Sequence, residues 1–190
     1  NIFSTLDTEE KCYWLGFIAA DGCLFEYNNG SVGLTIGLNK QDEEHLKKFQ
    51  YYIEDKRPLY KRETTNSVSL TIKQRELYDL LYSYELRPKK SLTLSFPNFL
   101  ITEEQKRWWI RGYIDGDGSL SISYNKDRNN YPVLMVGVVG TEDVLNHIKY
   151  YMNTEAKLYK KKNQQSFSIT LQGNHKVYKF INWVYNDAKI

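Results

Sequence analysis

Polar and apolar side chains alternate in several short stretches of the chain, with the two-residue period of a half-buried β-strand. The stretches SVSLTI at 67–72, SLSISY at 119–124 and SFSITL at 166–171 each place hydroxyl groups on one face. We expect helices to cover the opposite, apolar face and the hydroxyl face to stay open. The apolar face of the second stretch consists of Leu120, Ile122 and Tyr124.

Helical periodicity separates these stretches, and both halves of the chain follow the same order of elements. Each half is expected to fold as α-β-β-α-β-β-α, which makes the protein α+β with antiparallel sheets. The paired tyrosines at 51–52 and 150–151 are expected to pack in the core. Helices are expected at 8–22, 42–53, 75–84, 102–118, 142–152 and 175–185. Strands are expected at 23–27, 32–38, 59–63, 67–72, 119–124, 133–139, 158–162 and 167–171.

The two halves are copies of one another. Asp21 and Asp117 are 96 residues apart, and the LYK sequence at 59–61 recurs 99 residues later. Self-similarity of this kind predicts two equivalent structural units. The extra residues of the second half fall in a polar loop between 125 and 132, where insertions are tolerated. The expected units are a first half at 1–86, a proline-containing linker at 87–100 and a second half at 101–190.

The clearest repeat is WLGFIAADG at 14–22, which is matched by IRGYIDGDG at 110–118. Each copy carries glycine or alanine at its third and seventh positions, which lie four apart on one helix face. Small residues let two helix backbones approach closely, so we expect the helices to cross at Gly16 and Gly112. Glycine inside a helix costs roughly 1 kcal/mol relative to alanine, and close helix contact offsets that cost.

Both motif helices begin and end at residues suited to those places. Thr8 and Thr102 precede acidic first turns and are expected to cap the helix starts. Gly22 and Gly118 follow the helix ends, where we expect the left-handed conformation that glycine adopts easily.

The crossing of the two helices would bring the carboxylates of Asp21 and Asp117 together. Neighbouring carboxylates repel each other, and a divalent cation such as Mg²⁺, which prefers oxygen ligands, relieves the repulsion. Ions held in this way activate water and stabilise the leaving oxygen of a phosphodiester. The alternative, that Asp-Gly merely ends two helices, is weaker for two matched copies than for one. Asp115 is matched by Ala19, so this position is not part of a symmetric site.

Composition narrows the classes of function. With 41% hydrophobic and 26% charged residues, the chain is expected to be globular and soluble, and no apolar run is long enough to cross a bilayer. The formal net charge of +3 permits a polyanionic partner without demanding one.

Cys12 and Cys23 form no zinc pattern and are expected to be free thiols. His45, His147 and His175 have no partner spacing, so a histidine-based active site is not expected.

These motifs resemble those of the LAGLIDADG homing endonucleases, and the chain is similar to a monomer that carries both motif copies. The first copy departs from the family pattern at Ala19, where the first acid is usual. The second departs at Arg111 and Gly116, where alanine is usual. The resemblance implies a pseudo-two-fold protein whose sheets form a saddle over a long, asymmetric DNA site, with the motif helices packed at its centre.

The resemblance also implies a chemistry. It implies a site-specific endonuclease that cuts both strands of double-stranded DNA across the minor groove and leaves short 3′ overhangs. Asp21 and Asp117 are the implied catalytic metal ligands, and Ala20 and Gly116 are further metal-binding positions. Mg²⁺ is the implied cofactor, Mn²⁺ an alternative, and Ca²⁺ a substitute that permits binding without cleavage. No membrane partner is expected.

Basic residues near the metals organise water around the scissile phosphates in this family, which implies catalytic roles for Lys40 and Lys90. Lys40 follows the second strand, and its counterpart is expected at Val139 or Gly140, neither of which is basic. Lys90 lies in the linker, and its counterpart is expected at Lys189. The two active sites are therefore expected to be unequal.

Alternate residues of the strands read the bases in this family. Arginine and lysine are the usual readers of guanine, while hydroxyl groups contact either bases or phosphates. The alternative for any one of these positions is a solvated surface residue. The first half offers Phe25, Tyr27, Asn29, Thr35, Tyr60, Arg62, Ser67, Ser69 and Thr71. The second half offers Ser121, Ser123, Asn125, Met135, Tyr159, Lys161, Ser166, Ser168 and Thr170.

A second class of function fits the same sequence. A binding-only protein of this fold would regulate DNA or assist splicing of its own intron RNA as a maturase. Both motif acids are present, which favours the nuclease. No intein splicing block flanks the domain, so a free-standing or intron-encoded enzyme is expected. The abundance of Asn, Lys, Tyr and Ile is typical of an AT-rich genome, which predicts an intracellular protein of an organelle, a phage or a bacterial host.

Overall fold

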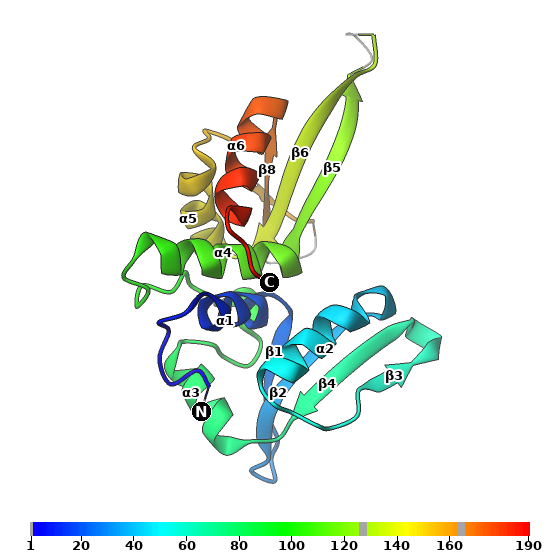
Figure 1. Ribbon diagram of the computed structural model, residues 1–190, viewed down its shortest axis with the longest axis vertical. Helices are drawn as coiled ribbons and strands as arrows, with labels where there is room; N and C mark the ends of the chain where they lie inside the picture. The colour runs from blue at the N-terminus through cyan, green and yellow to red at the C-terminus, as the bar shows by residue number, and fades with distance from the viewer. Residues whose placement is uncertain (1, 126–128, 163–165) are drawn as a thin grey trace.

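The computed structural model describes residues 2–125, 129–162 and 166–190, without the side chains of Ser91 and Asn125. Two similar halves lie one above the other, with a pair of helices between them (Figure 1). The first half contains α1 (Glu9–Asp21), β1 (Gly22–Glu26), β2 (Val32–Asn39), the 3₁₀ turn η1 (Lys40–Asp42), α2 (Glu43–Tyr52), β3 (Tyr60–Arg62), η2 (Glu63–Thr65), β4 (Ser67–Ile72) and α3 (Arg75–Ser83). After η3 (Lys90–Leu92), the second half contains α4 (Glu103–Asp117), β5 (Gly118–Asn125), β6 (Tyr131–Gly140), α5 (Glu142–Met152), β7 (Tyr159–Lys160), β8 (Phe167–Gln172) and α6 (Asn174–Tyr185).

The predicted α+β class and the repeated order of elements are confirmed, with every expected helix and strand found within two residues of its place. Each half has one four-stranded antiparallel sheet, in the order β1-β2-β4-β3 or β5-β6-β8-β7. The pairing register of the strands is also repeated. Leu38 of β2 pairs with Val68 of β4 in the first half, and Gly140 of β6 pairs with Phe167 of β8 in the second. Residues 126–128 of the expected polar loop lie outside the described part of the chain.

The crossing of α1 and α4 places two backbones in direct contact at the centre of the molecule (Figure 1). A Cβ atom added to Gly16 would lie 2.0 Å from the carbonyl oxygen of Trp109, and one added to Gly112 would lie 1.9 Å from that of Tyr13. Real side chains cannot approach a backbone so closely, so both positions require glycine. The predicted crossing point is confirmed.

The starts of the two central helices match their prediction, but the ends do not. The Thr8 hydroxyl accepts a hydrogen bond from the Lys11 amide at 3.4 Å, and Thr102 forms a reciprocal capping box with Gln105. Gly22 and Gly118 have φ values of −72° and −97° and are extended, so the predicted left-handed caps are wrong. The chain runs directly from each helix into a strand. Glycine is needed there because an added Cβ would lie within 2.6 Å of a carbonyl oxygen one turn earlier.

One predicted core face is exposed. Leu120, Ile122 and Tyr124 of β5 are 62%, 55% and 62% exposed. The reason is geometric: α6 contacts β6 and β8, and the long hairpin of β5 and β6 extends beyond that helix (Figure 1). The prediction that the paired tyrosines pack in the core holds for one member of each pair. Tyr52 and Tyr151 pack against the core, whereas Tyr51 and Tyr150 are exposed to solvent.

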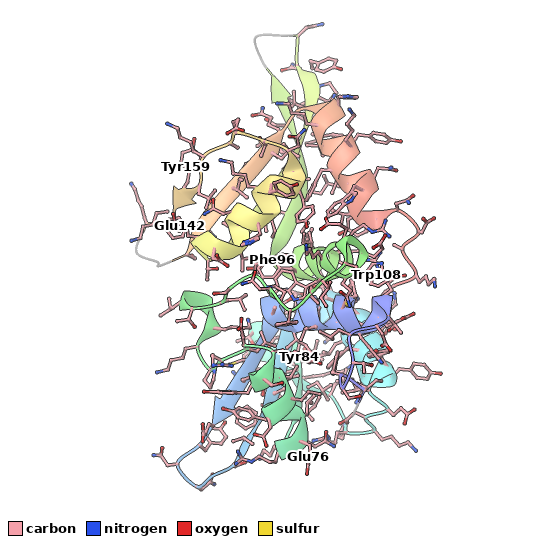
Figure 2. All side chains as sticks on the ribbon, turned by 90° about the vertical axis from the view of Figure 1, so that its left-hand side faces the viewer. Glu76, Tyr84, Phe96, Trp108, Glu142 and Tyr159 are labelled. Carbon is pink, nitrogen blue, oxygen red and sulfur yellow. The ribbon has the colours of Figure 1, made fainter. Side chains whose placement is uncertain are left out.

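The segment between α3 and α4 is fixed against the second half. The amide of Phe96 donates to the Asp143 carboxylate at 2.8 Å, and the Thr141 hydroxyl donates to the carbonyl of Leu94 at 2.6 Å. The Phe96 ring packs edge-on against Trp109 of α4, beside the central helices (Figure 2). These contacts determine where the preceding residues of the segment, including Lys90, are held. None of the described helices is long and apolar enough to span a bilayer.

Candidate metal centre and nucleic-acid interface

The close approach of the two helices continues to their C-terminal ends, where the motif acids lie. A Cβ added to Gly116 would lie 2.5 Å from Cβ of Ala20 and 2.8 Å from Oδ2 of Asp21. Burial, together with the negative charge of Asp117, raises the pKa of Asp21 to about 6. Burial also raises the pKa of Asp117, although the positive charges of Lys90 and Lys161 oppose that effect. The two carboxylates are therefore neighbours that repel each other.

Two pockets flank the helix ends, and the repeat relates them to each other. The first, of about 790 Å³, is lined by Asp21 of α1 together with Asp115 and Gly116 of α4. The second, of about 240 Å³, is lined by Asp117 of α4 together with Ala20 of α1. Each pocket thus combines the carboxylate of one helix with the end of the other helix. We call them the Asp21 pocket and the Asp117 pocket.

The residues at these pockets fit a divalent cation with oxygen ligands. Carbonyl oxygens at a helix end lack the usual intrahelical partners, so Ala20 and Gly116 can offer main-chain oxygens, the only ligands these residues have. In the part of the chain that the structure describes, no three acidic, histidine or cysteine side chains gather as a complete metal site. A site with few protein carboxylates and room for water and phosphate is typical of Mg²⁺.

The Asp117 pocket contains the predicted Lys90. This side chain is only 9% exposed, and its ammonium group donates a hydrogen bond to the carbonyl oxygen of Ala20 at 2.6 Å. Burial lowers the pKa of Lys90, while the charges of Asp117 and Asp21 act to raise it. The sequence places Lys90 in a linker, and the fold brings it to Asp117 and the end of α1.

The Asp21 pocket holds a hydrogen-bonded group that sequence reasoning missed. The hydroxyls of Tyr13 and Tyr185 both donate to the carboxylate of Asp115, the former at 2.6 Å. Nε2 of His45 lies 3.0 Å from the Tyr13 oxygen, and burial lowers the pKa of that histidine. His45 was expected to be an ordinary surface or filler residue. The one sequence signal was the acid Asp115 where the other copy has Ala19.

The other two basic residues considered have polar partners other than the motif carboxylates. The half-exposed Lys40 of η1 pairs with Glu63 at 3.0 Å, between Asn39 and Asp42, which line the Asp21 pocket. In the second half β6 ends at Gly140 and α5 begins at Glu142, so the 3₁₀ turn that carries Lys40 has no equivalent there. As expected, Val139 and Gly140 offer no base at this place. The amide of Lys189 donates to Glu9 at 3.1 Å, at the far end of α1 from Asp21. Lys189 therefore does not mirror Lys90.

The open faces of both sheets border the two pockets. Ser67 lines the Asp21 pocket, and its repeat counterpart Ser166 lines the Asp117 pocket. The predicted base-reading residues that are exposed are Tyr27, Asn29, Tyr60, Arg62, Thr71, Ser121, Ser123, Tyr159, Lys161 and Thr170. Those that are half-buried are Phe25, Thr35, Ser67, Ser69, Met135, Ser166 and Ser168. The side chain of Asn125 lies outside the described residues.

The strand pairing adds two residues to this surface. Cys23 is exposed and stands opposite Thr35, whose hydroxyl lies 3.0 Å from that of Thr71. Ser119 is exposed and stands opposite Gly137 in the second sheet. Both positions follow from the same two-residue step along the strand as the predicted residues. These residues extend the two open faces that border the pockets at Ser67 and Ser166.

Comparison with known proteins identifies the fold. No protein-family model and no curated protein sequence matches the chain. The I-LtrWI LAGLIDADG homing endonuclease bound to target DNA matches 96% of this chain and 85% of its own, with a TM-score of 0.67 and 13% identity. The I-SmaMI LAGLIDADG homing endonuclease bound to cleaved DNA matches 94% of this chain and 83% of its own, with a TM-score of 0.68 and 14% identity. I-SmaMI bound to uncleaved DNA in the presence of calcium ions matches with a TM-score of 0.66 and 14% identity. The chain therefore has the double-motif LAGLIDADG homing endonuclease fold.

Proposed function

We propose that this protein is a Mg²⁺-dependent, site-specific DNA endonuclease, with Asp21 and Asp117 as its metal ligands. The observation that carries the proposal is the convergence of these two carboxylates between two open sheet faces. The structural neighbours bound to target and cleaved DNA support the same choice of substrate. The product is a double-strand break with short 3′ overhangs, made across the minor groove of a long, asymmetric site.

The two pockets divide the reaction between the two strands. When bound, a divalent ion supplies Lewis-acid stabilisation of the phosphate and an activated water. Asp21 with the Gly116 carbonyl, and Asp117 with the Ala20 carbonyl, would hold such ions. The buried ammonium of Lys90 adds a positive charge beside Asp117. The Asp21 pocket has instead Asp115 and its hydrogen-bonded neighbours, so the strands are cut by unequal sites.

The surrounding surface would select the DNA. Arg62 and Lys161 are exposed at the edges of the two open faces and carry the donors that suit guanine or phosphate. The hydroxyl groups between them, such as those of Thr71 and Thr170, can contact bases or phosphates. Because the two faces differ in sequence, the site they read is expected to be asymmetric.

The proposal is tested by selecting cleaved sequences from a randomised duplex library in Mg²⁺ and bound sequences in Ca²⁺. We expect a long, asymmetric consensus shared by both selections. Asp21→Asn and Asp117→Asn should each lose double-strand cleavage of that duplex while keeping affinity for it in Ca²⁺, because each removes the charge that holds an ion. Asp79→Asn, at an exposed position on α3, is the matched control and should cleave normally.

Two results would contradict the proposal. Cleavage at full rate by the Asp21→Asn, Asp117→Asn double variant would show that these carboxylates are not the metal ligands. Binding to the selected duplex without any cleavage in Mg²⁺ or Mn²⁺ would instead indicate a binding-only protein, and splicing of an intron RNA would then be the activity to measure.

A further inference from the structure

Lys90 makes an unusual contact for a buried lysine. Its ammonium group lies on the carbonyl oxygen of Ala20 at 2.6 Å, at the end of α1. Asp117 lines the same pocket, and the charges of Asp117 and Asp21 both act on the ammonium group. The Lys90 ammonium thus contacts the main-chain oxygen of Ala20 in the pocket that Asp117 lines, and these two groups are the ligands proposed for the metal ion there.

The Asp21 pocket has no comparable occupant among the described residues. It is lined by the corresponding atoms, Asp21 and the end of α4 at Gly116, and its volume is about 790 Å³ against about 240 Å³ for the other pocket. Lys189, which the repeat predicts as the counterpart of Lys90, is held instead by its backbone amide at Glu9, at the other end of α1. Two sites built from equivalent elements therefore differ in whether the chain itself fills them.

We propose that the Lys90 ammonium takes the place of the divalent cation in the Asp117 pocket of the free protein. It follows that the first ion enters the Asp21 pocket, and that the Asp117 pocket accepts an ion only when Lys90 withdraws from Ala20. This inference rests on the proposed metal-dependent function and concerns the order in which its two ion sites fill.

The physical basis is competition between like charges. An ammonium group and a divalent ion that both contacted the Ala20 oxygen would lie close together and repel each other strongly in a partly buried pocket. Lysine suits a reversible role because its charge is compact and its four-carbon stem is flexible. A DNA phosphate at the pocket would attract the ammonium group away from Ala20, so DNA binding would open the site to the second ion. Lys90 would then stand beside the phosphate, where it could take the catalytic role that the family resemblance implies for it.

The test is Mn²⁺ binding to the free, full chain, measured by loss of the electron paramagnetic resonance signal of the free ion. Lys90→Met removes the charge, and Lys90→Gln removes the charge but keeps a donor for Ala20 if the methionine variant fails to fold. Both should gain affinity for one Mn²⁺ ion by on the order of tenfold or more, because a neighbouring positive charge is lost. Lys89→Met makes the same change at the exposed adjacent residue and should show no gain.

Two further substitutions show which pocket binds the additional Mn²⁺ ion. The increase in Mn²⁺ affinity of the Lys90 variants should disappear when Asp117→Asn is added and persist when Asp21→Asn is added. Unchanged or weaker Mn²⁺ binding in both Lys90 variants would overturn the inference. If Mn²⁺ still depended on Asp21 or Asp117 in that case, the proposed function would survive. Failure of every variant and of the wild type to bind Mn²⁺ would overturn both.

Discussion

At the scale of single residues, the two motif aspartates have the same sequence context and different surroundings. Burial raises the pKa values of both carboxyl groups. At Asp117 the positive charges of Lys90 and Lys161 oppose this effect. At Asp21 the negative charges of Asp117 and Asp42 add to it, while the charge of Lys90 opposes it. The metal-free protein therefore carries an unfavourable charge at Asp21 that a bound cation would remove.

This charge predicts a pH-dependent stability. The pKa of Asp21 is about 6 in the folded protein against an ordinary value of 3.8. The folded state holds the proton more tightly, so ionisation destabilises the protein as pH rises from about 4 to about 6 and the loss is complete above that range. Asp21→Asn, which stays neutral, should be more stable than wild type at pH 7.5 by roughly 1–3 kcal/mol in a metal chelator.

Urea unfolding between pH 4.5 and 8 measures this difference. The advantage of Asp21→Asn should shrink steadily as pH falls through 6, and Asp79→Asn should show no such trend. An advantage that is equal at all pH values would mean that the ionisation of Asp21 does not oppose folding. Saturating Mn²⁺ should reverse the order of stability at pH 7.5, because the ion binds the wild-type carboxylate in the folded state only.

At the scale of elements, the site depends on how closely α1 and α4 approach. The glycines at the crossing allow backbone contact, and this contact carries the carboxylates at the helix ends to within reach of each other. Gly112 is the most demanding position, because an added Cβ would lie 1.9 Å from the Tyr13 carbonyl oxygen and 2.8 Å from the Phe17 amide. Backbone atoms on a packed helix cannot move aside as a flexible side chain can.

Gly112→Ala should therefore force the helices apart. We expect it to lower the free energy of unfolding by about 3 kcal/mol or more, since overpacking against backbone is worse than ordinary overpacking. Gly37→Ala on β2 is the control, because the nearest atom to its added Cβ is 3.9 Å away. The comparison requires only chemical denaturation of the two variants. Equal stability of both would mean that α1 and α4 are not in backbone contact at this point.

At the scale of the whole molecule, much of the architecture was predictable because the chain repeats itself. A position at which the two halves differ therefore also indicated where the two pockets would differ, as Asp115 in place of Ala19 illustrates. The partners of Asp115 were not predictable, since Tyr13 and Tyr185 reach it from distant parts of the chain. The exposure of Leu120 was missed because strand alternation tells which residues share a face and does not tell whether a helix covers it.

The candidate metal centre depends on both local and long-range features of the chain. Asp21 and Asp117 could be named from the motif, because the two helices cross at equivalent glycines and each aspartate stands at the same distance beyond its glycine. The place of Lys90 could not, because it depends on how the segment after α3 packs on the second half. The result is a pair of related but unequal pockets, one with a lysine and one with an aspartate, tyrosine and histidine group.

The most direct test of the shared helix-end site is anomalous diffraction from crystals of the protein bound to its selected duplex and soaked in Mn²⁺. We predict Mn²⁺ peaks at the ends of α1 and α4, in contact with the carboxylates of Asp21 and Asp117 and with the phosphates at the cut positions. A complex that cleaves DNA in Mn²⁺ but shows no ion in contact with either carboxylate would contradict the proposed metal centre.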